Sequence, residues 1–212
     1  MVKRPEAVPA TVFELSAGRL CLDFANTWGD RGRPETDRLR TWADLLAFAR
    51  QAGSVEAARL DALEALAARA RRLASSGLAR ALELRESLHR IFSAEAAGRT
   101  VAPADLARLN AELAGAFRGA RLAASGDGFS WRWDGEPSDL SEPLRPIARS
   151  AAELLTSAEL GRVRECAGAD CTWLFLDASR AGSRRWCSMA SCGNRAKARR
   201  FYRRHRGGGL PA

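Results

Sequence analysis

Four cysteines in the last quarter of the chain are spaced like the ligands of a metal ion. Four residues separate Cys166 from Cys171 and Cys187 from Cys192, and 15 residues lie between the two pairs. Zinc takes four tetrahedral ligands, and two close pairs joined by a loop supply them at modest loop-closure entropy. The spacing therefore predicts a Zn²⁺ site with these four thiolates as ligands. The alternative, four cysteines that are simply buried, does not explain the symmetric spacing.

The start of the chain and its cysteine usage predict a cytoplasmic protein. Residues 1–10 hold two basic residues but no apolar stretch before a cleavage site, so they do not resemble a secretory signal. No apolar run approaches the roughly 20 residues that span a bilayer, so we expect no membrane segment. In a reducing compartment, cysteines at short spacing serve as metal ligands rather than disulfides. Cys21, between Leu20 and Leu22, is predicted to be a small buried hydrophobe.

The net charge of the chain, +9, is confined to its last quarter. Residues 161–212 hold 12 Lys and Arg against 3 Asp and Glu, whereas the rest of the chain is balanced. Seven cations fall within residues 195–206, which contain no acid and have the spacing of a helix. Their mutual repulsion would be relieved by a polyanion, which favours nucleic acid over a merely solvated helix.

We predict that nucleic acid is bound by the cations in and before this helix, together with one amide. These residues are Arg184, Arg185, Asn194, Arg195, Lys197, Arg199, Arg200, Arg203, Arg204 and Arg206. Double-stranded DNA is the expected partner, and RNA binding or protein interaction without operator specificity is the alternative. On the opposite side of the helix, Ala198, Phe201 and His205 are expected to pack.

The elements around the cysteines follow the order of a treble-clef finger. Residues 172–176 are predicted to form a strand, and residues 184–186 a return strand. A helix is expected from about Gly193 to His205, where its dipole favours the Cys192 thiolate. Together these elements predict a turn with two ligands, then a hairpin, then a basic helix.

The upstream residues predict a helix-rich α+β domain of about five helices with two β-hairpins. Alternating apolar residues at 12–15 and 19–24 favour a first hairpin, and residues 121–134 a second. Helices are expected at about 41–53, 54–75, 78–97, 103–117 and 142–156, with Thr41 as a helix cap. The expected divisions are a flexible start (1–10), this domain (11–160), the finger (161–206) and a flexible tail (207–212).

Two stretches of the sequence resemble known families. Cys192-Gly193-Asn194-Arg195, with Arg185-Trp186-Cys187 before it, is similar to the CGNR zinc finger, which is named for this tetrapeptide. The stretch Leu22-Asp23-Phe24-Ala25-Asn26-Thr27 resembles the opening of the ABATE domain. That domain precedes the CGNR finger in bacterial proteins described as stress-induced transcription regulators. The resemblance implies zinc at the four cysteines, DNA binding by the finger, and an upstream domain that senses a signal.

Polar residues in the upstream domain offer few sites for a ligand or for catalysis. Asp23 and Asn26 are the best candidates for contacting a small-molecule effector, although such residues commonly satisfy backbone groups near a turn. His89 and His205 are the only histidines, and there is no nucleophile motif or phosphate-binding loop, so we expect no enzyme. A homodimer is plausible because one finger offers few base contacts.

Overall fold

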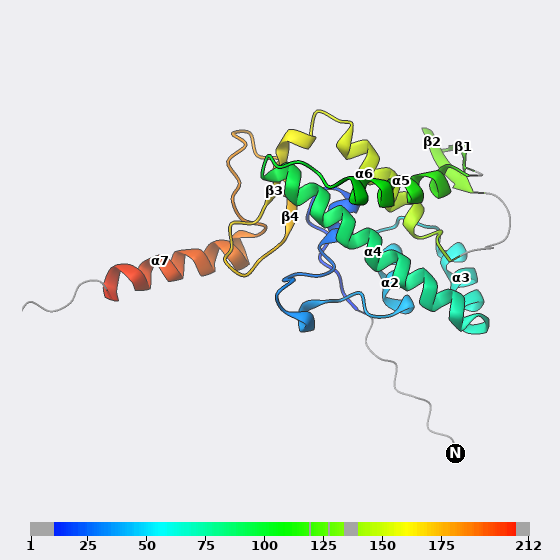
Figure 1. Ribbon diagram of the computed structural model, residues 1–212, viewed down its shortest axis with the longest axis horizontal. Helices are drawn as coiled ribbons and strands as arrows, with labels where there is room; N and C mark the ends of the chain where they lie inside the picture. Colours follow the sequence, from blue (N-terminus) through cyan, green and yellow to red (C-terminus); the bar gives the residue numbers. More distant parts are fainter. Residues whose placement is uncertain (1–10, 119, 127, 134–139, 207–212) are drawn as a thin grey trace, which may run out of the picture.

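The computed structural model describes residues 11–118, 120–126, 128–133 and 140–206, with the side chains of residues 204–206 excepted. The expected flexible start at 1–10 and the tail at 207–212 lie outside this part of the chain. The helices are α1 Leu20–Ala25, α2 Trp42–Gln51, α3 Ala57–Arg69, α4 Arg71–Ala96, α5 Pro103–Phe117, α6 Leu144–Leu155 and α7 Asn194–Arg206 (Figure 1). The strands are β1 Ala120–Ser125, β2 Gly128–Trp133, β3 Val163–Glu165 and β4 Leu174–Leu176, with short helical turns η1 Pro34–Thr36, η2 Leu160–Arg162 and η3 Met189–Gly193. The predicted helix-rich α+β class is confirmed.

The short helix α1 lies at the centre of the hydrophobic core. It packs against α4, α6 and β4, and its residues Cys21, Leu22 and Phe24 are fully buried. The prediction of a first hairpin over residues 12–24 is therefore wrong: residues 20–25 are helical, and residues 11–16 adopt no regular structure. Cys21 is buried as expected, and burial raises the pKa of its thiol to about 12.

Local signals in the sequence placed most of the other helices correctly. Thr41 and Asp44 form the predicted capping box, in which each side chain accepts a hydrogen bond from the backbone N–H of the other residue. Pro103 opens α5, as its missing N–H allows. The second hairpin is confirmed as the antiparallel pair β1–β2, with Leu122 opposite Trp131.

The boundary between α3 and α4 differs from the prediction. The break falls at Ala70, and α4 then continues through Gly77 for 26 residues. A β-carbon at Gly77 would lie 2.8 Å from the Trp42 ring and 3.2 Å from the side chain of Leu140. Gly77 is therefore a close packing site inside a helix, not the start of one.

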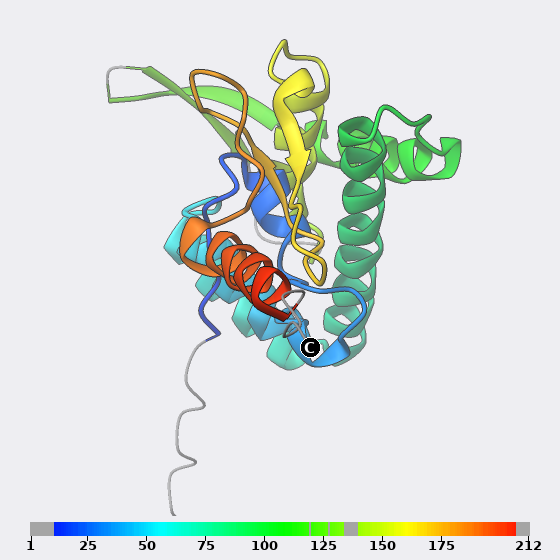
Figure 2. The same cartoon turned by 90° about the vertical axis from the view of Figure 1, so that its left-hand side faces the viewer.

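The two strands β3 and β4 pair with each other and belong to the core of the helical domain. Val163 lies opposite Leu176, and both side chains join the main core with Leu174. In Figure 2, β3 lies beside the long helix α4, which it contacts. By contrast, α7 packs against η3 and then extends away from the body (Figure 1). Within the described residues, no helix has the length and apolar character needed to cross a membrane.

Candidate metal centre and nucleic-acid interface

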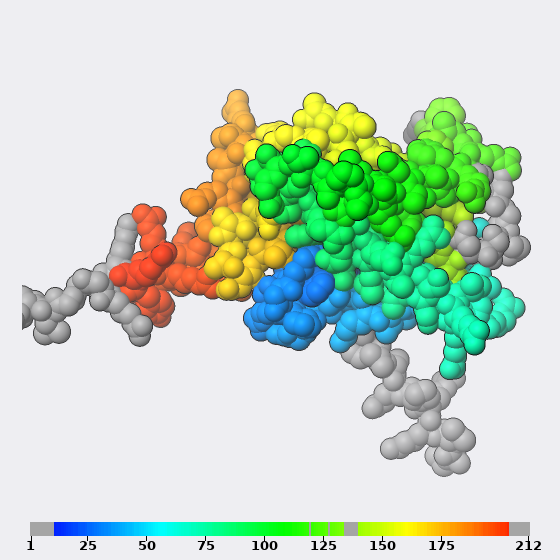
Figure 3. Space-filling view, in the orientation of Figure 1, coloured from blue at the N-terminus to red at the C-terminus, as the bar shows by residue number. Residues whose placement is uncertain are grey.

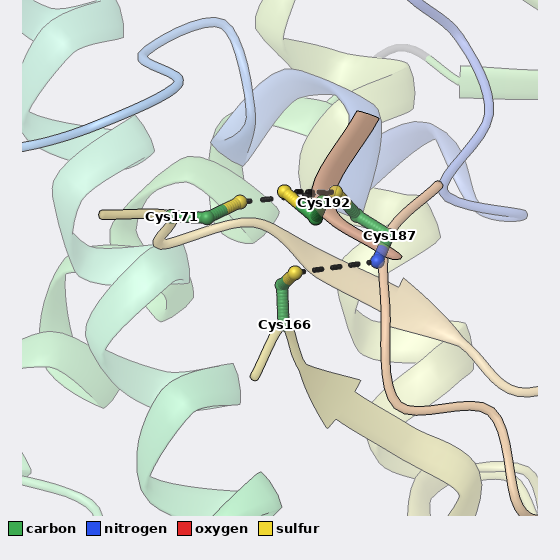
Figure 4. A group of neighbouring side chains, drawn as sticks. All are labelled: Cys166, Cys171, Cys187 and Cys192. Atoms are coloured by element: carbon green, nitrogen blue, oxygen red, sulfur yellow. Dashed lines mark hydrogen bonds between the residues drawn. The ribbon is translucent and has the colours of Figure 1, made fainter. Parts of the chain in front are cut away.

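The four cysteine side chains converge on one point (Figure 4). All four Sγ atoms lie within 4.8 Å of one another. The Sγ of Cys187 is 3.7 Å from that of Cys171 and 3.6 Å from that of Cys192. A tetrahedral zinc ion with Zn–S bonds of about 2.3 Å requires sulfur atoms about 3.8 Å apart, so the donor type, number and spacing fit Zn²⁺.

Two turns and two strands place these ligands. Cys166 directly follows β3, and Cys171 lies three residues before β4, so the β3–β4 pair fixes the spacing of the first two ligands. The backbone N–H of Cys166 donates to the carbonyl of Trp173. In the turn between them, a β-carbon at Gly168 would lie 3.1 Å from Cβ of Cys171 and 3.3 Å from Sγ of Cys192. The turn therefore closes tightly over the sulfur cluster.

Hydrogen bonds to sulfur set the protonation of the thiols. The backbone N–H of Cys187 donates to Sγ of Cys166 at 3.3 Å. The hydrogen bond between Cys171 and Cys187 lowers the pKa of Cys171 to about 6 and raises that of Cys187. This hydrogen bond therefore favours the thiolate form of Cys171, which is the form that binds a metal.

Arg195 links the metal centre to helix α7. Its guanidinium donates to Sγ of Cys192 at 3.0 Å, and this hydrogen bond raises the pKa of Arg195. Four thiolates around a divalent ion leave a net charge of −2, which a nearby guanidinium partly offsets. Asn194 donates to the carbonyl of Ala190 and so bonds within its own turn. A β-carbon at Gly193 would lie 2.7 Å from the Met189 sulfur.

A small apolar cluster supports the cysteines. Phe175 is fully buried among the ligands, with Trp173 and Trp186 half-buried around it. Arg184 covers the Phe175 ring at 4.3 Å and donates to the carbonyls of Trp186 and Cys187. Arg184 thus supports the apolar cluster, and the nucleic-acid contact predicted for it stays a prediction.

The predicted return strand at residues 184–186 does not form. β4 pairs instead with β3, the strand that directly precedes Cys166. Residues 184–186 are held by side-chain contacts of Arg184, by a hydrogen bond from the Arg184 N–H to Asp177, and by one from the Ala167 N–H to the Arg185 carbonyl. Sequence periodicity identified the first strand but not its partner, because the partner lies outside the segment between the ligand pairs.

Side chains of the helical domain hold the residues next to the ligands. Asn26 donates to the carbonyl of Leu174 at 2.8 Å and accepts from its N–H at 2.9 Å. Arg31 donates to the hydroxyl of Thr172, and Nε2 of His89 lies 2.8 Å from the Thr172 carbonyl. Ser93 donates to the Glu165 carboxylate at 2.6 Å.

A buried ion-pair network lies behind the Arg31 contact. Arg31 pairs with Glu86 at 2.8 Å, and Glu86 also pairs with Arg85. Arg85, which is only 2% exposed, donates two hydrogen bonds to Asp37 at 2.7 and 2.8 Å. The guanidinium groups of Arg31 and Arg85 both lie over the Trp28 ring, 5.8 and 5.3 Å from its centroid. This network connects α4 and the loop at 28–37 to Thr172, the residue after Cys171. The sequence did not predict the contacts of Arg31 and His89 with Thr172, because neither residue belongs to a motif.

Helix α7 and the turn at 167–170 form a groove of about 770 Å³ beside the metal centre. Arg195, Arg199 and Arg203 line its helical side, with Trp186 and Tyr202. Arg199 donates to Asp170 across the groove at 2.7 Å. Lys197 and Arg200 are exposed, as is Arg185, whose guanidinium stacks on Trp186. Arg204 and Arg206 end the helix, and their side chains lie outside the described part.

The apolar side of α7 does not pack as predicted. Phe201 is 57% exposed, Tyr202 is 65% exposed, and Ala198 is also exposed. The helix projects beyond the body (Figure 3), and the rings of Phe201 and Tyr202 contact each other edge to face with centroids 6.0 Å apart. The side chain of His205 is outside the described part.

The two candidates for effector binding are engaged with backbone groups. Asp23 accepts a hydrogen bond from the N–H of Ala17 at 2.8 Å, and burial raises the pKa of its carboxyl to about 6. Asn26 is buried and uses both ends of its amide on Leu174. These contacts favour the structural role that the sequence left open for both residues.

A tetrathiolate cluster between a strand pair and a basic helix defines a zinc finger protein, here joined to a helical domain. The chain belongs to the ABATE family, described as "Putative stress-induced transcription regulator", which matches residues 18–158, and the CGNR zinc finger matches residues 162–205. These are regulator and zinc-finger families rather than enzyme families. Among curated proteins, none matches this chain.

Proposed function

We propose that this protein is a zinc-dependent transcription regulator whose finger binds double-stranded DNA through α7. The observation that carries this proposal is the 13-residue helix α7, which has no acid and seven Arg or Lys residues. It is held at one end by the sulfur cluster, and residues 194–203 are exposed apart from the half-buried Ala196. Such a helix is about 20 Å long and has the diameter that the major groove of DNA admits.

The distribution of charge on α7 suits a groove with phosphates on both sides. Arg199 and Arg203 lie on the side that faces the turn at 167–170, whereas Lys197 and Arg200 continue the charged arc around the helix. A helix inserted in the major groove meets one phosphate backbone on each flank. The proposal also accounts for the exposure of Phe201 and Tyr202, because a helix that enters a DNA groove needs an accessible surface.

Zinc has a positional role in this proposal. Only Gly193 lies between Cys192 and the start of α7. In the first turn of α7, Arg195 donates a hydrogen bond to the Cys192 sulfur. The metal therefore fixes the direction in which the cations project. Four thiolates leave no open coordination position for water, so we expect no catalysis at this centre.

RNA binding is the second candidate, and the aromatic residues of the groove favour it. Trp186 and Tyr202 lie beside Arg195 and Arg199 in the groove, where they could stack on unpaired bases. Competition between duplex DNA, single-stranded DNA and structured RNA separates the candidates. DNA regulation predicts that the duplex competes best and that log affinity falls with log salt by about 0.9 per phosphate contacted. A preference for RNA, or a flat salt response, would contradict it.

We further propose that the helical domain transmits a signal to the finger through Arg31 and Thr172. A cavity of about 600 Å³ is lined by Trp28, Arg85 and Glu86, and Glu86 is the ion-pair partner of Arg31. A small molecule bound there would change the contact between Arg31 and the turn that holds Cys171. The test is a thermal-shift screen followed by duplex binding: a hit should alter DNA affinity in the wild type but not in Arg31→Ala. Such a regulator would act in the cytoplasm, and light scattering would test whether it is a homodimer.

A further inference from the structure

One acidic side chain stands in the otherwise basic groove beside α7. Asp170 projects from the turn between Cys166 and Cys171 and lines the groove with Arg195, Arg199 and Arg203. It accepts a hydrogen bond from Nη2 of Arg199 at 2.7 Å, and both side chains are about half exposed. An exposed aspartate is ionised at neutral pH, so the groove holds one fixed negative charge.

A carboxylate at this place is unfavourable for a phosphate contact. A phosphate approaching Arg199 would meet the negative charge of Asp170 at close range and would have to compete with it for the guanidinium. The pair carries no net charge, so it adds little to the attraction of a polyanion. What the pair does supply is a guanidinium with a fixed orientation, whose other N–H groups have no hydrogen-bond partner among the described residues.

A guanidinium held in this way is suited to a base edge. A free arginine loses side-chain entropy when it binds, and a partner that already fixes its orientation reduces that loss. Guanine offers two acceptors, O6 and N7, in the major groove, and a bidentate contact from arginine to these atoms is the commonest specific protein–DNA contact. The base edge is uncharged overall and is therefore not repelled by Asp170.

We propose that Arg199, oriented by Asp170, recognises a guanine in duplex DNA, while Lys197, Arg200 and Arg203 contact phosphates. This assignment rests on the DNA-binding function proposed above, and it specifies guanine as the base that Arg199 contacts. Asp170 is a positioning residue in this account, because it acts through Arg199.

The test uses the full-length, zinc-loaded protein and the duplex that it enriches from a random pool, with a scrambled duplex of the same composition as reference. Each guanine of the enriched duplex is replaced in turn by 7-deazaguanine, which lacks the N7 acceptor. Wild type should lose about tenfold in affinity at one position. Arg199→Ala, which has no donor to offer to a base, should bind the enriched duplex more weakly and be insensitive at that same position.

Two further variants separate base recognition from phosphate binding. Asp170→Asn should bind the scrambled duplex more tightly and have a lower ratio of enriched to scrambled affinity, because a repulsive charge is removed and Arg199 loses its orientation. Lys197→Ala should weaken binding to both duplexes equally and lower the salt slope by about one. Zinc content and circular dichroism of each variant establish that it is folded.

Four results would overturn the inference. If no guanine position responds in wild type while salt-dependent duplex binding is intact, base recognition by Arg199 is excluded and the proposed function survives. If Arg199→Ala keeps its response at that position, or Asp170→Asn tightens both duplexes equally, Arg199 is a phosphate contact. If no duplex binding is seen at all, the proposed function fails and this inference with it.

Discussion

Single buried polar side chains join the finger to the helical domain. Asn26 is 4% exposed and satisfies both the N–H and the C=O of Leu174, a residue 148 positions later in the chain that is fully buried. Neither backbone group can reach water if the amide is removed. The amide is therefore a structural tie between α1 and the strand that leads out of the metal turn.

Replacing Asn26 by Ala should destabilise the fold by about 2–4 kcal/mol, because it leaves a buried donor and a buried acceptor unsatisfied. The measurement is urea unfolding at saturating zinc. Asn110→Ala is the matched control, since Asn110 is exposed on α5, and a change within about 0.5 kcal/mol is expected there. Equal stabilities of the two variants would show that Asn26 is not such a tie.

Asp23 predicts a specific dependence of stability on pH. Burial raises the pKa of its carboxyl in the folded state to about 6, above the ordinary value of 3.8. Between these values the folded state binds more protons than the unfolded state, so the contribution of Asp23 to stability decreases as pH rises. Asp23→Asn keeps an acceptor for the Ala17 N–H but does not titrate. Its stability relative to wild type should rise between about pH 4 and pH 6 and then level off.

The control for this prediction lies in the same pair of unfolding curves. Below about pH 3 the wild-type carboxyl is protonated in both states, so the difference between the two proteins should be constant there. A difference that does not change across the whole range would contradict the raised pKa.

Among the elements, the turn between the first two ligands is the one whose backbone the metal centre constrains most closely. Gly168→Ala would place a methyl group 3.1 Å from Cβ of Cys171 and 3.3 Å from Sγ of Cys192. The turn would have to shift and carry its ligands with it. We expect about tenfold weaker zinc binding, since supporting groups of a metal site typically contribute that much.

Competition with a chromophoric zinc chelator measures this effect. Gly161→Ala is the matched control, because a β-carbon there meets no atom within 4 Å. Zinc affinity should be unchanged in the control. Unchanged affinity in both variants would mean that the turn is not tightly closed over the sulfur atoms.

Elements with strong local signals were predictable from the sequence, and those defined by packing were not. The capping box at Thr41 and the first-turn Pro103 mark helices by chemistry within a few residues. Residues 20–24 alternate like a strand, but Cys21 between them is buried too, and contacts with α4 and α6 make the segment helical. The cysteine ligands were predictable because their spacing is local. Arg31 and His89 were not, because each lies more than 80 positions before Thr172 in the chain.

At the scale of the whole molecule, the finger and the helical domain share a core. Val163, Leu174 and Leu176 of β3 and β4 belong to the main hydrophobic cluster, although they lie in the segment that matches the CGNR finger. The division into two units at residue 160 stays a prediction, and β3 and β4 beyond it pack into the main core. In the described part of the finger, the ligand turns, the loop at 177–186, η3 and α7 lie outside that core.

Cys187→Ser should accordingly loosen the region beyond β4 and leave the body folded. Loss of one thiolate removes much of the free energy with which zinc holds the finger. Hydrogen exchange should show fast exchange for amides of η3 and α7, while those of α1, α4 and β4 stay protected. Loss of protection in β4 together with α7 would mean that the metal, not the core, holds this strand.

The central claim is that the zinc centre orients a basic helix for binding to DNA. The most direct test is to titrate zinc into metal-free protein and measure its affinity for a labelled duplex at fixed salt. Because the cations of α7 persist without metal, weak and salt-sensitive binding should be present from the start, and affinity should then increase and level off at one zinc ion per chain. An affinity that is the same with and without zinc would contradict the account.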